Sequence, residues 1–413
     1  MLRKFGVVGA LATVLAVVVS ATMGGTASAR NSSLLASASV KCGHSVTIGV
    51  AYPATGNAAS IGVLQWDWAN FAKQQWNKGH ALKINLIPGD TKLATDASAN
   101  IAVAHTFSSN GKILAVTGPA GSQEVEDATG IYESHGLANV SGSATRVELT
   151  RDLVRSGGRP RFTDPGYFFR TVPNDGQQGD RVAYWMAKKV KAKRIYIIDD
   201  SESYSQGLAT QVTKDLKRKY GITLTGTDHV DQTLPHDFSS VIAKIPANTQ
   251  IVYTPWQEPA EAQSFYDQYH TARPSTTTIQ FGSDGTDDPS TFTGAGSLVS
   301  GFPVDFSNAK VATFAKAHNG NQELFGLPTY TATLVNATAI RMACHAGHGT
   351  TNRNAVRKDI QKVQLTTAQS LLGFPVQFLN RNVGSFQGPG DMGGTADFAI
   401  YQIQSNGKYK RLG

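Results

Sequence analysis

The stretch GKILAVTGPAGSQEVEDATGIYESHGLANVSGSAT, residues 111–145, contains in one unit the pattern that decides the fold. Lys112 to Gly118 is a short run of apolar and β-branched residues, typical of a buried strand. Glu124 to His135 has the pattern of a helix, and Leu137 to Ser143 predicts a second strand. A strand, a helix and a strand at this spacing predict two parallel strands joined by a right-handed crossover.

The same alternation extends from this unit in both directions and occurs twice along the chain. The other strand-like runs are Val46 to Tyr52, Leu82 to Pro88, Arg194 to Asp200, Ile222 to Val230, Gln250 to Pro255 and Thr277 to Asp284. The other helical patterns are Ala58 to Asn77, Thr95 to Ser108, Gly179 to Val190, Ser205 to Tyr220, Phe238 to Lys244 and Pro259 to Ala272. We therefore predict an α/β protein with two doubly wound parallel-sheet lobes.

The chain after residue 301 is too long to be a simple tail. It has helical patterns at Ala309 to His318, Tyr330 to Ala346 and Asn352 to Val363, then strand patterns at Phe374 to Asn380 and Ala396 to Gln404. This order predicts that the chain crosses back and completes both lobes. The length of 413 residues agrees, because a chain of this size usually divides into two domains.

The first residues predict export. Arg3-Lys4 precedes an apolar run, Phe5 to Val19, and Ala27-Ser28-Ala29 is a small-x-small cleavage signature. The apolar run has about fifteen residues, fewer than the roughly 20 that a membrane span needs. We expect residues 1–29 to be a signal peptide, residues 30–43 to be a mobile leader, and the mature protein to lie in the periplasm or outside the cell.

The charge pattern argues against a nucleic-acid partner. The formal net charge is +8, but the basic residues are scattered, and the densest cluster is Lys188 to Arg194. A nucleic-acid surface would need a concentrated basic stripe, usually with aromatic residues between the charges. We therefore expect no nucleic-acid partner.

Polar side chains follow several predicted strands, two sets in each half of the chain. Ser122 stands at a helix start, where its hydroxyl can cap the helix and the unpaired amides favour a carboxylate. Ser143 and Thr145 follow the next strand, and in the second half Tyr204 and Asp284 follow two others. Each position alone is explained as well by an ordinary cap or turn. Since all lie at the carboxyl ends of parallel strands, together they indicate one shared cleft.

Several of these residues belong to motifs whose order and spacing are specific. The motifs are Thr55-Gly56 with Gly62, Gly118-Pro119-Ala120-Gly121-Ser122, Ser141-Gly142-Ser143-Ala144-Thr145, Phe169-Arg170-Thr171, Tyr204-Ser205-Gln206-Gly207 and Gly282-Ser283-Asp284-Gly285. From about Val46 to its end, the chain resembles the type I periplasmic binding proteins of the group that binds leucine, isoleucine, valine and related solutes.

The resemblance implies a fold of two lobes joined by a three-segment hinge. Lobe I would comprise residues 44–169 and 305–372, and lobe II residues 172–301 and 374–413. The two cysteines, Cys42 and Cys344, then fall in the same lobe. Oxidation is permitted in an exported chain, so the resemblance makes a disulfide between them plausible.

The resemblance also implies a set of ligand contacts. Ser122 and Thr145 would hold the α-carboxylate of an amino acid, and the carbonyl of Ser143 and the side chain of Asp284 would meet its ammonium. Tyr204 would close over the ligand. The protein would act as a monomer without a cofactor and would present the ligand to the membrane permease of an ABC transporter.

The side-chain pocket departs from the family pattern. Ile61 stands where many relatives have an aromatic residue, and Trp256 or Gln257 occupies a second aromatic position. Branched-chain specificity therefore does not carry over directly. The same fold could instead bind an amide, urea or an aromatic acid, or act as a ligand sensor.

Two alternative functions for such residues are an enzyme active site and a metal-binding site. The sequence has no G-x-S-x-G elbow, and the histidine nearest to the cleft motifs is His135 at a helix end. Cys344, His345 and His348, even with Cys42 and His44, match no standard zinc spacing. We therefore predict a binding protein that is not an enzyme and holds no metal.

Overall fold

The structure is a computed structural model that describes residues 38–93, 97–151, 166–231, 236–302, 308–317, 325–394 and 398–413. The predicted signal peptide and residues 30–37 of the leader lie outside these ranges. The same holds for the predicted helix start at Thr95 and the predicted lobe boundary at residue 305.

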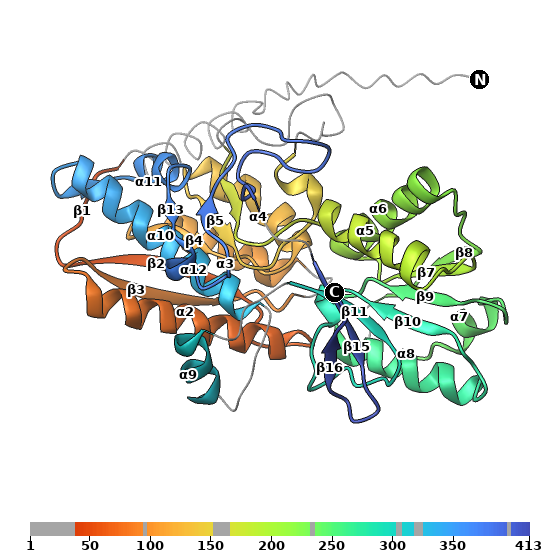
Figure 1. Ribbon diagram of the computed structural model, residues 1–413. Coiled ribbons are helices and arrows are strands. Elements are labelled where there is room, and N and C mark those ends of the chain that lie inside the picture. Colours follow the sequence, from red (N-terminus) through yellow and green to blue (C-terminus); the bar gives the residue numbers. More distant parts are fainter. Residues whose placement is uncertain are drawn as a thin grey trace, which may run out of the picture.

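The first lobe is built on a five-stranded parallel sheet with the strand order β3-β2-β4-β5-β6 (Figure 1). Its strands are β2 (Ser45–Tyr52), β3 (Lys83–Asp90), β4 (Ile113–Thr117), β5 (Asn139–Ser141) and β6 (Phe168–Arg170). The main helices of this lobe are α2 (Ala59–Gly79), α3 (Ser98–Ser109), α4 (Ser122–Ser134), α9 (Ala309–Ala317), α10 (Gly326–Ala346) and α11 (Arg353–Ile360). Helices α2 and α10 cover one face of the sheet, and α3 and α4 cover the other.

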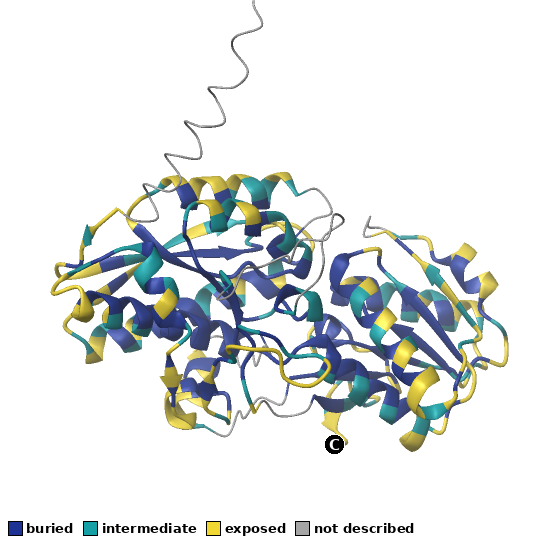
Figure 2. Ribbon diagram, turned by 90° about the horizontal axis from the view of Figure 1, so that it is seen from above, coloured by how far each residue is buried: buried dark blue, intermediate teal, exposed yellow. Residues whose placement is uncertain are grey.

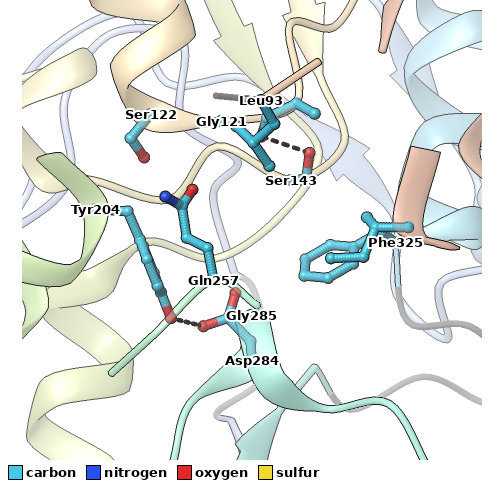
Figure 3. Close-up of a pocket in the computed structure, with 11 residues that line it drawn as sticks. Leu93, Gly121, Ser122, Ser143, Tyr204, Gln257, Asp284, Gly285 and Phe325 are labelled. Atoms are coloured by element: carbon cyan, nitrogen blue, oxygen red, sulfur yellow. Dashed lines mark hydrogen bonds between the residues drawn. The ribbon is translucent and has the colours of Figure 1, made fainter. Parts of the chain in front are cut away.

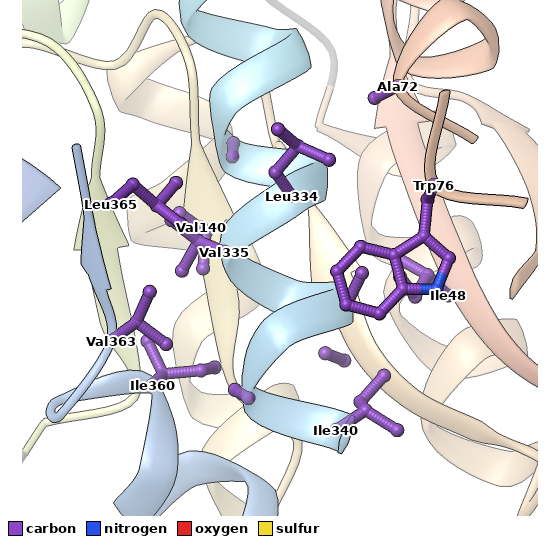
Figure 4. Close-up of a cluster of buried hydrophobic side chains, with 14 of the residues drawn as sticks. Ile48, Ala72, Trp76, Val140, Leu334, Val335, Ile340, Ile360, Val363 and Leu365 are labelled. Atoms are coloured by element: carbon purple, nitrogen blue, oxygen red, sulfur yellow. The ribbon is translucent and has the colours of Figure 1, made fainter. Parts of the chain in front are cut away.

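Helix α10 gives the first lobe a rigid centre. Its side chains are buried almost throughout, and Leu334, Val335 and Ile340 pack in one core with Ile48 of β2 and Trp76 of α2 (Figure 4). A helix that is apolar on most of its circumference is stable only inside such a core. The residue before this helix, Phe325, is thereby held at the edge of the lobe.

The second lobe has a seven-stranded sheet with the order β16-β15-β11-β10-β9-β7-β8. Its parallel strands are β7 (Ile195–Asp199), β8 (Gly226–His229), β9 (Ile251–Thr254), β10 (Ile279–Gly282) and β11 (Leu298–Gly301), and β15 (Ala399–Ile403) and β16 (Tyr409–Arg411) add an antiparallel edge. The helices are α5 (Asp175–Tyr184), α6 (Ser203–Tyr220), α7 (Ser239–Lys244) and α8 (Pro259–Ala272). Each face of the sheet has its own apolar core.

The chain passes between the two sheets three times, after β6, after β11 and before β15. Two buried interiors, separate in Figure 2, correspond to the two lobes. At the hinge, the carboxylate of Asp391 accepts hydrogen bonds from Arg170 Nε at 2.5 Å, Thr150 Oγ1 at 2.9 Å and Asn174 Nδ2 at 3.1 Å. The predicted α/β fold with two doubly wound lobes and a three-segment hinge is confirmed.

The segment that begins at residue 374 was expected in the second lobe, but it packs against the first lobe. Val376 begins a strand of two residues, β14 (Val376–Gln377), which pairs with β13 (Gln364–Leu365) and not with the second sheet. Val376 and Phe378, on either side of the exposed Gln377, and Met392 pack in the core of the first lobe. We therefore propose that the first lobe extends to about residue 393, beyond the expected boundary at 372.

The end of the leader is fixed to the first lobe. Strand β1 (Val40–Lys41) pairs with β12 (Thr350–Thr351), and Cys42 forms a disulfide with Cys344. The disulfide that the resemblance implied is therefore present. Residues 40–42 of the expected leader are held in the structure by this backbone pairing and by the disulfide. No helix in the described ranges has the length and apolar character required to cross a membrane.

Candidate ligand-binding site

A cavity with an empty volume of about 350 Å³ lies between the lobes (Figure 3). The first lobe contributes Ile61, Leu93, Ala120, Gly121, Ser122, Ser143 and Phe325, and the second contributes Tyr204, Gln257, Asp284 and Gly285. Ser122, Tyr204 and Asp284 follow the carboxyl ends of β4, β7 and β10, as the rule for open parallel sheets requires.

The first-lobe wall is centred on the start of helix α4. Gly121 is the N-cap and Ser122 the first helical residue. The Ser122 hydroxyl accepts a hydrogen bond from the Arg146 amide at 3.2 Å, so its own hydrogen remains to be donated into the cavity. The Ser143 hydroxyl donates to the Ala120 carbonyl at 2.7 Å and therefore fixes the loop before α4.

A buried carboxylate already occupies part of this helix start. Glu124 accepts from the amides of Ala120 and Gly121 through Oε2, at 3.1 and 3.0 Å, and from the Leu93 amide through Oε1 at 3.1 Å. Burial raises the pKa of Glu124, while the hydrogen bonds lower it. The sequence signal for this contact is a Glu three residues after the N-cap. A ligand carboxylate is left with Ser122 and the amides of the first turn, which have no acceptor within the helix.

The second-lobe wall carries a carboxylate. Tyr204 Oη donates to Asp284 Oδ1 at 2.5 Å, and Gln178 donates a second side-chain hydrogen bond to Asp284. Burial raises the pKa of Asp284 to about 6, although these hydrogen bonds lower it. None of the ion pairs among the described residues includes Asp284. At neutral pH the cavity wall therefore holds a buried negative charge that no cation in the described ranges neutralises.

Two of the expected site residues do not line the cavity. The Thr145 carbonyl accepts a hydrogen bond from the Asp175 amide at 2.9 Å, and burial and Asp284 raise the pKa of this neighbouring Asp175 well above its usual range. Thr145 therefore serves the layer behind the cavity. The Trp256 indole donates to the Ile198 carbonyl at 2.7 Å within the second-lobe core, so Gln257 alone of this pair reaches the cavity.

The apolar part of the wall comes largely from residues that sequence reasoning missed. Ile61 was expected there, but Leu93 and Phe325 were not. Phe325 packs with Ile61 and Phe302 in a small apolar cluster near the crossings between the lobes. Nothing local in the sequence marks Phe325, because it reaches the cavity only through the path of the chain.

The lobes touch directly across the cleft. Arg146 of the first lobe donates through Nη1 to the Ser203 carbonyl at 2.8 Å and to the Ser203 hydroxyl at 2.6 Å, at the start of α6. The same guanidinium donates through Nε to Glu148 at 3.0 Å. The structure is therefore a closed arrangement in which both lobes contribute to one cavity.

The sequence of residues 45–408 matches the model of a family described as periplasmic binding protein. This match spans most of the chain. The chain belongs to the periplasmic binding protein family. The family, the fold and the two-lobed cavity thus agree with the resemblance read from the motifs, and the family consists of binding proteins.

Individual relatives give the same result. An amino acid binding protein of Pseudomonas aeruginosa is 27% identical over 375 residues, which cover 89% of this chain and 92% of the relative. A solved leucine binding protein from Thermotoga maritima has a TM-score of 0.70 at 18% identity and covers 89% of this chain and 98% of its own. A solute binding protein of R. palustris in complex with benzoate has a TM-score of 0.70 at 16% identity, with coverage of 89% and 96%. The two structures show that the fold is shared.

Proposed function

We propose that this periplasmic binding protein captures an amino acid or an amino-acid-like molecule in the cleft between its lobes. One observation carries the proposal: a hydroxyl and a helix start lie on one wall, and on the other lies a buried carboxylate that no cation of the described residues pairs with. A zwitterion fits such a cavity, because its carboxylate needs donors and its ammonium needs an acceptor. The relative from Pseudomonas aeruginosa, an amino acid binding protein, supports this ligand class.

The mechanism that we propose is hinge closure. The ligand carboxylate first binds at Ser122 and the first turn of α4. The second lobe then brings Asp284 to the ammonium and Tyr204 over the ligand. Because the open state offers only half of these contacts, the ligand binds the closed state more tightly and shifts the population toward it.

Export and delivery complete the proposal. We infer that the signal sequence directs the protein to the periplasm or the cell exterior and that a monomer presents the ligand to the permease of an ABC transporter. Family membership and the N-terminal sequence support this role. The closed state would be the form that the permease recognises.

A thermal-shift screen tests the ligand class. Free amino acids, their amides and small carboxylic acids such as benzoate are added in turn to the purified mature protein. A ligand at 100 times its dissociation constant adds about 2.7 kcal/mol to the free energy of unfolding. A response to amides or benzoate alone would contradict the proposal and favour a carrier of neutral or aromatic solutes.

Asp284→Asn tests the role of the carboxylate. We expect the affinity for the best amino acid to fall about 10- to 100-fold, because a hydrogen bond to a charged group contributes about 1.5–3 kcal/mol. Calorimetric titration measures the change. Asp267→Asn, at an exposed position of helix α8, is the matched control and leaves the affinity unchanged. Equal affinities of both variants would remove Asp284 from the site.

A further inference from the structure

The cleft continues beyond the cavity just described. A second cavity with an empty volume of about 830 Å³ shares Ile61, Gly285 and Phe325 with the first. Its other lining residues are Ala59, Ser60, Val63, Leu64, Pro259, Asp287, Asp288 and Ser290. Both lobes contribute to it. The shared residues form the passage between the two cavities.

The second cavity has one apolar and one acidic side. Helix α2 supplies Ile61, Val63 and Leu64, and Val63 is 48% exposed, the largest exposed fraction among the large apolar residues that the structure describes. On the opposite side, the turn after β10 supplies Asp287 and Asp288. No lysine, arginine or histidine belongs to the described lining of this cavity.

The two acids differ in how their oxygens are used. The carboxylate of Asp288 accepts from the Ser290 hydroxyl at 2.5 Å and from the Thr291 hydroxyl at 2.8 Å. Asp287 is only 8% exposed, and its Oδ2 has no hydrogen-bond partner among the described residues. The hydroxyl of Tyr409, which lies near Asp287, does not fill this gap, because it donates its hydrogen to the Phe292 carbonyl at 2.8 Å. Burial, Asp284 and Asp288 raise the pKa of Asp287 well above its usual range, because no cation among the described residues compensates its charge. A cationic donor from outside the protein would satisfy the unpaired oxygen and stabilise the ionised carboxylate.

We propose that the natural ligand is an amino acid with a long side chain that ends in a cation, an ammonium or a guanidinium. This inference rests on the proposed function and extends it. The head group occupies the first cavity, the methylene chain passes between Ile61 and Phe325, and the cation reaches Asp287. Methylene chains pack well along apolar surface while their charged end meets a polar partner.

The charge of the second cavity disfavours an anionic or a purely apolar end group. An anionic end would meet Asp287 and Asp288 without a compensating cation. A purely apolar end would leave the Asp287 oxygen without a donor and add no new hydrogen bond. A cationic end is the one choice that satisfies both the charge and the unpaired acceptor.

Two amino acids that differ only at the end of the side chain test the inference. L-lysine is L-norleucine with a terminal ammonium, so calorimetric titration of both isolates that group. We expect the wild-type protein to bind lysine at least about tenfold more tightly than norleucine, from the charged hydrogen bond at Asp287. In Asp287→Asn this preference is lost while norleucine binds as before. Asp267→Asn serves again as the control and keeps the preference.

The possible results separate this inference from the proposed function. If norleucine binds and lysine binds equally or more weakly, the cation site is wrong and the amino-acid function stands. A lysine preference that persists in Asp287→Asn also overturns the cation site. If neither amino acid binds the wild-type protein, and no other free amino acid does, the proposed function fails and the inference fails with it. The wild-type comparison decides even if the variant does not fold.

Discussion

The hinge and the cleft each bury a carboxylate, with different surroundings. At the hinge, Asp391 pairs with the fully buried guanidinium of Arg170 and accepts further hydrogen bonds from Thr150 and Asn174. In the cleft, Asp284 is equally buried, but its hydrogen-bond donors are neutral: the side chains of Tyr204 and Gln178 and the backbone amides of Asp284 and Gly285. The protein supplies a cation to the first carboxylate and none, among the described residues, to the second.

The difference in surroundings indicates that Asp391 has a structural role and Asp284 a role in ligand binding. A buried ion pair at the hinge fixes how the chain crosses between the lobes, because both partners come from crossing segments or their flanks. A buried charge without a partner costs free energy in the ligand-free protein. That cost is recovered when a ligand brings the missing cation. Removing the two carboxylates should therefore change stability in opposite directions.

The largest expected effect follows from removing the hinge carboxylate. Asp391→Asn leaves the guanidinium of Arg170 buried without its negative partner. Loss of one partner of a buried pair typically costs about 3–5 kcal/mol of unfolding free energy. Urea unfolding of the ligand-free protein measures the loss. The surface ion pair of Lys244 and Asp228 provides the control, because Lys244→Ala removes a solvent-screened contact and should change the unfolding free energy little. Similar losses in both variants would show that the hinge pair has no special role.

The fold could be predicted because its signals are local. Each lobe repeats a strand and a helix, and each repeat has its own apolar pattern, such as Lys112 to Gly118 before Ser122. The rule that ligands bind at the carboxyl ends of parallel strands then brought Ser122, Tyr204 and Asp284 to one cleft. None of these steps needs a long-range contact. The same rule predicted the cleft itself but not its full extent.

The positions of the hinge pair and of the other cavity residues depend on long-range contacts that no local sequence pattern indicates. Arg170 and Asp391 are 221 residues apart, and Phe325 reaches the cavity only after the second crossing. Thr145 and Trp256 follow strands, as the cavity residues do, but packing turns their side chains toward the layer behind the cavity and the second-lobe core. Strand ends locate a site, whereas the direction of each side chain is set by its neighbours.

The pH dependence of the unfolding free energy tests whether Asp284 is a buried charge without a compensating cation. Burial raises the pKa of Asp284 from 3.8 to about 6, so the folded protein holds this proton more tightly than the unfolded chain does. The stability that the protonated Asp284 carboxyl contributes is therefore complete below about pH 4. As the pH rises through about 6, the free energy of unfolding falls by at most about 1.4 kcal/mol per pH unit. Asp284→Asn lacks this loss.

At pH 7 we expect ligand-free Asp284→Asn to be more stable than the wild-type protein by about 1–3 kcal/mol, and the difference should vanish near pH 4. Unfolding free energies from pH 4 to pH 8 measure it. Acids that do not interact with Asp284 cancel in this comparison. Asp284 raises the pKa of Asp175 and Asp287, so both ionise more readily in the variant and add to its gain in stability. If the variant is less stable at pH 7, the Asp284 carboxylate is already compensated within the protein, and the contrast with Asp391 disappears.

The smallest expected effect lies where the two lobes meet. Arg146 is partly exposed and donates to Ser203 across the cleft, whereas the nearby Arg151 donates to the Gly384 carbonyl outside the second lobe. Arg146→Ala removes contacts that exist only in the closed state, so ligand affinity should fall about fivefold, equivalent to about 1 kcal/mol. The unfolding free energy of the ligand-free protein should change less, because closure contributes little to holding each lobe together. Arg151→Ala is the matched control and keeps the affinity. Equal losses of affinity in both variants would mean that the contact with Ser203 does not stabilise closure, and that the ligand alone holds the lobes together.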